Sequence, residues 1–401
     1  MVYRLLGKGI LSSVLLGMAA SLIWYGINTN RIAAKDWEFQ LRHPSSLIFP
    51  EVLLLKGNMA YYVNLDGAAA ADAYREAVSR DPVFIEAWLA LAKAEQALGH
   101  EDEAVKIIET ISPLISHVST WKWQELLLAF EMRNEAQFAD CFNFILAKLP
   151  NRISEACYLA LSFWGNWSTI LPHVTSGSRL AFLDQLMNAK EVDVALSLWE
   201  QMEGSDKVPG RDLRLRFCQF LIGNGRVGPA TTVWKSWTQN EGVEIHDGGF
   251  EAPPLNRGFG WLFGRHPEVS IERSLETPYQ GSHCLNIHFR GTQNVVFNHV
   301  TQIVPVEPDR SYVLRFAWRS RNLNTDQGVF VNVSGFRCNG LNVQSEPALG
   351  SSHWTKEEMS LTVPATCQAI QIQVRRKESL KFDNKIAGDY WIDAVELQPE
   401  K

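Results

Sequence analysis

The feature that most restricts the fold of this 401-residue chain is a spacing of 35 residues that recurs in its first half. A fixed spacing of this length is typical of stacked helix pairs, each of which buries its apolar face against the next pair. Four pairs of like residues show it: Trp88 and Trp123, Ala104 and Ala139, Ala195 and Ala230, and Trp199 and Trp234.

The segment from Ala87 to Pro113 shows what one such unit contains. Trp88 and Leu91 fall on one face of a first helix, and Gly99 ends that helix. Ala104 and Ile108 fall on one face of a second helix. Two helices approach closely only where a side chain is small, which gives Ala104 a structural role. We therefore expect a helical solenoid over 46–242.

The pattern resembles the tetratricopeptide repeat, although it fails between Ile153 and Thr175. The resemblance implies a groove that binds a protein partner, and the alternative is a solenoid that only spaces and packs the next domain. The matching residues are Ala70, Tyr74, Ala77 and Pro82; Trp123, Leu126, Phe130, Ala139 and Pro150; Phe182, Leu186, Ala195 and Trp199; and Phe217, Leu221, Gly225, Ala230 and Trp234.

The N-terminus carries an uninterrupted apolar run, 10–27, that follows a basic start. About 18 helical residues span roughly 27 Å, enough for a bilayer core. Trp24 and Tyr25 at its far end are typical of interfacial anchors. We expect a single transmembrane anchor in the inner or cytoplasmic membrane, with the bulk of the chain extracytoplasmic, or periplasmic if bacterial. A cleaved signal peptide is the alternative.

Beyond Gly242 the composition changes to glycine-rich loops and alternating β-type segments. Strands at this density without helical patterns predict an antiparallel two-sheet sandwich over 243–401. In 312–320, Tyr312 and Phe316 are expected in the core and Arg315 and Arg319 outside it. The expected strands are 285–289, 295–306, 312–320, 329–336, 369–376 and 390–397.

This half resembles the jelly-roll carbohydrate-binding modules of families 4 and 9. The resemblance rests on GGFE (248–251), GFGW (258–261), GSHCLNIHF (281–289), TQIVPVEPDRSYVLRFAWRS (301–320) and GDYWIDAVEL (388–397). It implies polysaccharide binding along a sheet face or at loop tips. It also implies a structural calcium at Glu251 and Asp393, although both carboxylates could simply be solvated or hydrogen-bonded.

A sugar-binding site needs aromatic faces for stacking and polar groups for the hydroxyls. Several arginines together favour an acidic glycan, because guanidinium pairs bidentately with carboxylate. A solvated outer sheet face would look similar, and the module could also lack a ligand. The candidate residues are Trp261, Phe259 and Phe263 in a glycine-rich loop, and Asn298, Arg315, Arg319, Asn332, Gln373 and Arg375 together on one polar, arginine-bearing strand face.

Charge and motifs exclude several function classes. A net charge of −6 argues against nucleic-acid binding. Six dispersed cysteines without a CxxC exclude a zinc module and disfavour a disulfide framework. No catalytic signature is found, so we do not expect an enzyme. The expected domains are a tail (1–9), the anchor (10–27), a linker (28–45), the repeats (46–242) and the sandwich (243–401).

These features together predict a membrane-anchored extracytoplasmic scaffold that joins a protein partner to a glycan, for example in assembly or export of a cell-surface polysaccharide. The alternatives are a protein-only scaffold with a ligand-free β module and a polysaccharide-modifying enzyme.

Overall fold

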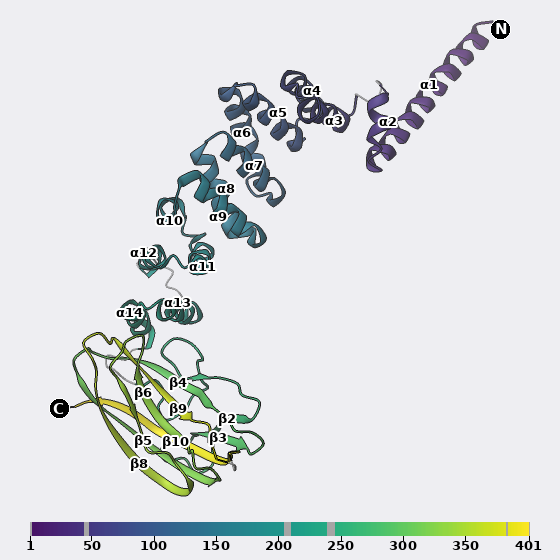
Figure 1. Cartoon of the computed structure of the whole chain (residues 1–401). Helices are drawn as coiled ribbons and strands as arrows, with labels where there is room; N and C mark the ends of the chain where they lie inside the picture. Colours follow the sequence, from purple (N-terminus) through teal and green to yellow (C-terminus); the bar gives the residue numbers. More distant parts are fainter. Residues whose placement is uncertain (1, 44–47, 204–209, 239–244, 382–383, 401) are drawn as a thin grey trace. The chain divides into compact units, whose positions relative to one another are not determined.

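The computed structural model describes residues 2–43, 48–203, 210–238, 245–381 and 384–400 (Figure 1). They form two compact units, Met1–Asn188 and Ala189–Lys401. The first unit is helical, and the second begins with helices and ends in two β-sheets. The predicted order, helices first and then an antiparallel sandwich, is therefore confirmed.

In the first unit, consecutive helices pack against each other as pairs, α3 with α4, α5 with α6 and α7 with α8. Alanines make this possible: Ala77, Ala92 and Ala104 are completely buried, so the helix backbones approach closely. The helices are α1 (Val2–Ala33), α2 (Trp37–Arg42), α3 (Pro50–Tyr62), α4 (Gly67–Arg80), α5 (Ile85–Ala97), α6 (Glu101–Ile115), α7 (Ser119–Glu131), α8 (Glu135–Lys148), α9 (Ile153–Trp164), α10 (Trp167–Ile170) and α11 (Arg179–Ala189).

The N-terminal helix α1 does not meet the prediction of a membrane anchor. Within the part of the chain that the structure describes, no helix combines the length and apolar character needed to cross a bilayer. The apolar run continues as helix into Asn28 and Arg31, and Arg31 pairs with Asp36 at 2.6 Å. Trp24 and Tyr25 contact Phe49, with ring centroids 5.9 and 5.4 Å away. The predicted transmembrane anchor at 10–27 and the single-pass location that depended on it are wrong.

The second unit ends in a sandwich of two antiparallel sheets, ordered β1-β4-β9-β6-β7 and β2-β3-β10-β5-β8. Tyr312, Leu314 and Phe316 are buried between the sheets, as the alternation predicted. The elements are α12 (Val192–Glu203), α13 (Arg211–Gly223), α14 (Val227–Thr238), β1 (Leu262–Phe263), β2 (Val269–Ser274), β3 (Cys284–Arg290), β4 (Phe297–Pro305), β5 (Ser311–Leu323), β6 (Phe330–Gly335), β7 (Asn342–Gln344), β8 (Gly350–Thr362), β9 (Ala369–Arg376) and β10 (Ala387–Pro399).

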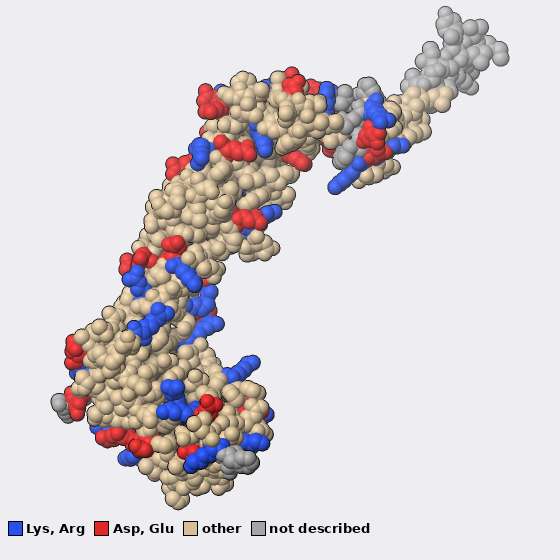
Figure 2. All heavy atoms as spheres, in the orientation of Figure 1, with Lys and Arg blue, Asp and Glu red and all other residues tan. Residues whose placement is uncertain are grey.

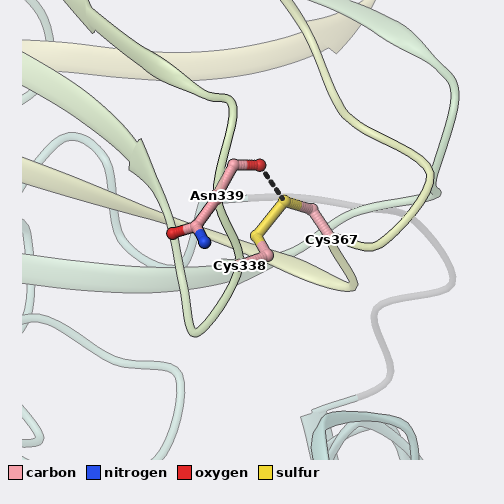
Figure 3. The surroundings of a disulfide bond; sticks show 3 residues. All are labelled: Cys338, Asn339 and Cys367. Carbon is pink, nitrogen blue, oxygen red and sulfur yellow. Dashed lines mark hydrogen bonds between the residues drawn. A yellow bond between two sulfur atoms is a disulfide. The ribbon is translucent and has the colours of Figure 1, made fainter.

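A disulfide joins Cys338, in the loop after β6, to Cys367, in the loop before β9 (Figure 3). Gly335 lies against it, since a Cβ there would come within 2.6 Å of the Cys338 sulfur. Sequence spacing disfavoured a disulfide framework, but the sandwich brings these two distant loops together and permits this one bond. The other four cysteines are free and buried.

Candidate functional site

The glycine-rich loop that precedes β1 does not present its aromatic side chains to solvent. Trp261 is only 2% exposed, and its indole N–H donates to the Asp247 carbonyl at 3.1 Å. Phe259 is 3% exposed and packs edge-on against Trp234 of α14. Phe263 on β1 is half-buried and packs against the sandwich core. The prediction that Trp261 and Phe259 stack on a sugar from an open loop is therefore wrong.

The reason is that this loop joins the sandwich to the helices of the same unit. The Gly258 N–H donates to the Gln219 side-chain oxygen of α13 at 2.8 Å. Gly258 has φ +62°, and a Cβ there would meet the Trp234 ring at 2.7 Å. Arg257 pairs with Asp212 at 2.9 Å. A glycine-rich loop usually lies at the surface, but here two helices cover it.

The predicted strand-face residues are divided between two sheets. Arg315 and Arg319 lie on β5, whereas Asn332, Gln373 and Arg375 lie on β6 and β9 of the other sheet. The prediction that they share one arginine-bearing face is therefore wrong. Sequence alternation shows which side of a strand a residue occupies but not which sheet the strand joins.

On the outer face of β2-β3-β10-β5-β8, carboxylates already neutralise the arginines. Arg315 donates to the Glu358 carboxylate at 2.8 Å, and Arg321 donates to Asp389 at 3.0 Å. The Arg319 guanidinium lies 4.0 Å from the centroid of the Trp391 ring and donates to the Glu276 carbonyl at 2.7 Å. Positive and negative side chains are likewise interspersed over the surface seen in Figure 2. These arginines therefore hold the sheet together and have little capacity left for a ligand.

The outer surface of the other sheet forms what we call the polar face. Two rows of side chains cross its strands, in the order β4, β9, β6 and β7. The first row is Thr301, Gln373, Asn332 and Gln344, and the second is Ile303, Gln371, Ser334 and Asn342. Arg375 lies beside the first row, opposite Phe330. The structure thus brings three predicted residues, Asn332, Gln373 and Arg375, onto one surface.

Some side chains of the polar face are hydrogen-bonded to one another, whereas the Gln373 side chain is available to a ligand. The Asn332 amide donates to the Asn342 side chain at 2.9 Å, and its oxygen accepts from Arg375 at 3.3 Å. Gln371 donates to the Thr301 hydroxyl at 3.1 Å. Gln373 is half-buried at the centre of the face and has no hydrogen-bond partner among the described residues. Its amide can therefore both donate to and accept from a ligand.

Sequence reasoning missed several members of the polar face. Lys377 continues the two-residue period of Gln373 and Arg375, so alternation could have identified it. Asn342 and Gln344 lie on the three-residue strand β7, which is too short to show a period. Asn298 is exposed in an irregular part of β4, outside the two rows.

The two candidate calcium ligands converge on one loop between β2 and β3. Glu251 accepts from the Ser282 N–H at 2.7 Å, and Asp393 accepts from the N–H groups of Tyr279 and Gln280 at 2.9 and 3.0 Å. Both also face Gly249, since a Cβ there would lie 3.9 Å from an Asp393 oxygen and 4.0 Å from a Glu251 oxygen.

The pKa values of Glu251 and Asp393 shift in opposite directions. Burial raises the pKa of Asp393, and the nearby Glu251 charge adds to that rise. Hydrogen bonds from the backbone of Ser282 and His283 lower the pKa of Glu251. Oxygen ligands suit calcium. Among the described residues no three His, Cys, Asp or Glu side chains are grouped for a metal, so backbone carbonyls would have to complete the shell. The calcium site stays a prediction.

Comparison with known proteins gives a fold likeness but no family. No protein-family model matches the chain, and no curated protein matches it. Similar solved structures include one described as "CBM4 structure and function", at 15% identity and TM-score 0.30, covering 39% of this chain and 99% of that one. Another is the CBM22-1 xylan-binding domain from Paenibacillus barcinonensis Xyn10C, at 15% identity and TM-score 0.28, covering 40% and 96%. A third is a cyclase from Fischerella sp. TAU, at 14% identity and TM-score 0.29, covering 40% and 98%.

With TM-scores this low, these likenesses carry no conclusion about what the sandwich binds or whether it catalyses a reaction. The tetratricopeptide identity of the helices stays a prediction as well.

Proposed function

We propose that the sandwich binds a polysaccharide across its polar face. The observation that carries this proposal is the free amide of Gln373, flanked in register by Thr301 and Asn332. Amide and hydroxyl groups donate and accept hydrogen bonds at the same site, which is what sugar hydroxyls need from a binding surface.

The geometry of the sheet supports an extended ligand. Neighbouring strands lie about 4.8 Å apart, so the row from Thr301 to Gln344 offers polar groups at regular intervals across four strands. Gln344 and Asn342 at the β7 edge are exposed, while Gln373 and Arg375 are half-buried. A chain of sugars running across the strands would meet polar side chains on β4, β9 and β7, whereas Asn332 on β6 is buried and positions Arg375.

Affinity electrophoresis of the full chain through gels that contain a plant or bacterial polysaccharide tests this function. We expect at least one polymer to retard the protein, and Gln373→Ala to weaken that binding about tenfold, because one or two hydrogen bonds are lost. Arg315→Gln is the matched control, since Arg315 lies on the other sheet and pairs with Glu358. The proposal fails if no polymer retards the protein or if both variants behave alike.

A second function, binding of a protein segment by the helical unit, is favoured by two hollows that share Leu127. One is lined mainly by apolar side chains, and the other also by the charged side chains of Glu86, Lys93 and Glu131. The first has a volume of about 420 Å³ between α7 and α9, and the second about 280 Å³ across α3, α5 and α7. Tyr158 at the first is 72% exposed and Tyr62 at the second 61%. Large exposed apolar side chains that cluster in this way are typical of protein interaction sites. The chain would then connect a glycan to a protein.

A random peptide library selected on the full chain tests the second function. Selected peptides should carry apolar anchor residues, and their binding should fall about thirtyfold or more in the double variant Tyr158→Ala with Trp123→Ala, since a buried aromatic anchor contributes on the order of 2 kcal/mol. Val83→Ala is the control, an exposed apolar residue outside both hollows. Peptides without a shared apolar pattern, or equal loss in the control, would count against this function.

A further inference from the structure

We propose that the polar face selects polysaccharides that carry carboxylate groups. This inference rests on the proposed glycan binding and names the ligand class. It is carried by two cations, Arg375 and Lys377, that the structure places on this face without a neutralising acid.

The partners of these two cations are neutral amides. Arg375 donates to the Asn332 oxygen at 3.3 Å, and Lys377 donates to the Gln344 oxygen at 3.3 Å. The Lys377 ammonium also lies 5.3 Å from the centroid of the Phe330 ring. No described carboxylate forms an ion pair with Arg375 or Lys377, and neither row of the polar face contains an acidic residue. The two rows together with Arg375 and Lys377 therefore carry a net positive charge, and neither cation is in an ion pair among the described residues.

The opposite sheet shows that this is not a general property of the sandwich. There Arg315 pairs with Glu358 at 2.8 Å, and Arg321 pairs with both Glu276 and Asp389. The arginines of that sheet are balanced by carboxylates of the same chain. The arginines of that sheet thus have carboxylate partners within the protein, whereas Arg375 and Lys377 on the polar face have none among the residues described.

The spacing of the cations suits an anion that repeats along a polymer. An extended chain rises about 3.3 Å per residue, so Arg375, in β9, and Lys377, which follows the last residue of β9, are about 7 Å apart along the backbone at most and can contact separate groups of one polymer. A guanidinium forms two parallel hydrogen bonds with a carboxylate, and a carboxylate is the anion that uronic acids carry. The amide of Gln373 next to them remains available for hydroxyl groups, and Gln344, whose oxygen accepts from Lys377, still has its amide N–H groups to donate.

Binding of the full chain to polygalacturonate and to the same polymer with its carboxylates methyl-esterified tests the proposal, because esterification removes the negative charge and leaves the sugar backbone and hydroxyl groups unchanged. We expect about tenfold tighter binding to the free acid at low salt, since charge-assisted hydrogen bonds are roughly twice as strong as neutral ones. In R375Q/K377Q the preference should disappear, while binding to the methyl ester should stay the same. R315Q should keep the preference, and dextran sulfate serves as an anion without carboxylates.

The outcomes distinguish selection for carboxylates from glycan binding in general. Equal binding to the acid and the ester, or an equal loss of preference in R315Q, overturns carboxylate selection and leaves glycan binding standing. Equally tight binding to dextran sulfate overturns selection for carboxylate and shows attraction to any polyanion. Binding to no polymer overturns glycan binding itself, and polymer binding that Q373A leaves unchanged overturns its placement on the polar face.

Discussion

Asp389 links three strands of the β2-β3-β10-β5-β8 sheet. Its carboxylate accepts from His288 on β3 at 2.9 Å and from Arg321 on β5 at 3.0 Å. Burial alone would raise the pKa of Asp389, but the hydrogen bonds and charges of His288 and Arg321 outweigh burial and hold that pKa below its usual value. Its stabilising contribution is therefore present above the unfolded-state pKa and is lost as the pH falls through the folded-state pKa.

Replacing Asp389 by Asn should make unfolding easier in a way that depends on pH. At about pH 7 we expect a loss of about 1–2 kcal/mol in the free energy of unfolding, because two charge-assisted hydrogen bonds weaken. As the pH falls through the lowered folded-state pKa of Asp389, the wild-type carboxylate becomes protonated, and the difference in the free energy of unfolding should shrink towards zero. Urea unfolding over a series of decreasing pH values measures this. Asp309→Asn, in an exposed loop, should show no such dependence.

Glu251 and Asp393 supply a second prediction at the scale of single residues. A calcium ion between them would relieve the repulsion that helps to raise the pKa of Asp393. A ligand present at about 100 times its Kd adds about 2.7 kcal/mol, so calcium should raise the Tm by about 5–10 °C relative to EDTA. The effect should vanish in Glu251→Gln and persist in Glu378→Gln, a change in an exposed carboxylate after β9 that does not line the pocket beside Glu251. Identical melting in calcium and EDTA would exclude the ion.

The burial of Trp261 could not be predicted from its local sequence. Its glycine-rich surroundings correctly predicted a loop, but its exposure depends on Phe250, whose ring centroid lies 5.1 Å away, and on the Asp247 carbonyl. Gln373 shows the opposite case, since the period of two in β9 sufficed to place it on an outer surface.

At the scale of elements, the buried strands could be predicted and the edge strands could not. β5 and β9 alternate apolar and polar residues and bury the apolar ones, which is the signal that alternation detects. β8 is equally long as β5 but lies at the sheet edge, is largely exposed and reads GSSHWTKEEMSLT. An edge strand with polar residues on both sides carries no clear period, and charged residues there protect the edge from pairing with another chain.

The disulfide provides an element-scale prediction, because it ties the loop after β6 to the loop before β9 across 29 residues. Replacing both Cys338 and Cys367 by Ser should lower the free energy of unfolding by about 2–4 kcal/mol, since the unfolded chain gains freedom. Thermal melting measures the change. Reductant should lower the Tm of the wild type to that of the variant and leave the variant itself unchanged. A variant as stable as the wild type would show that the bond does not form.

At the scale of the whole molecule, the sequence predicted that helices precede a sandwich, but the compact units divide at 188 and 189. Helices α12, α13 and α14 therefore fall in the same unit as the sandwich, and α13 and α14 contact it directly. The contacts responsible are specific: Trp234 meets Phe259, Gln219 accepts from Gly258, and Arg337 donates to the Gly223 carbonyl. The sequence could not predict these contacts, because periodicity within one helix or loop does not show which distant residue it will contact.

These contacts predict that a sandwich fragment needs its two helices. A fragment of residues 210–401 should unfold at a higher temperature than one of residues 245–401, because removal of Trp234 and its neighbours exposes Phe259, and an exposed aromatic of this size costs about 1.5–3 kcal/mol. Differential scanning calorimetry of both fragments measures the difference. Trp234→Ala in the longer fragment should move its Tm most of the way to that of the shorter one, whereas Lys235→Ala, at an exposed neighbouring position, should not. If both fragments melt at the same temperature, α13 and α14 rest against the sandwich without stabilising it, and Phe259 must be covered by the sandwich alone.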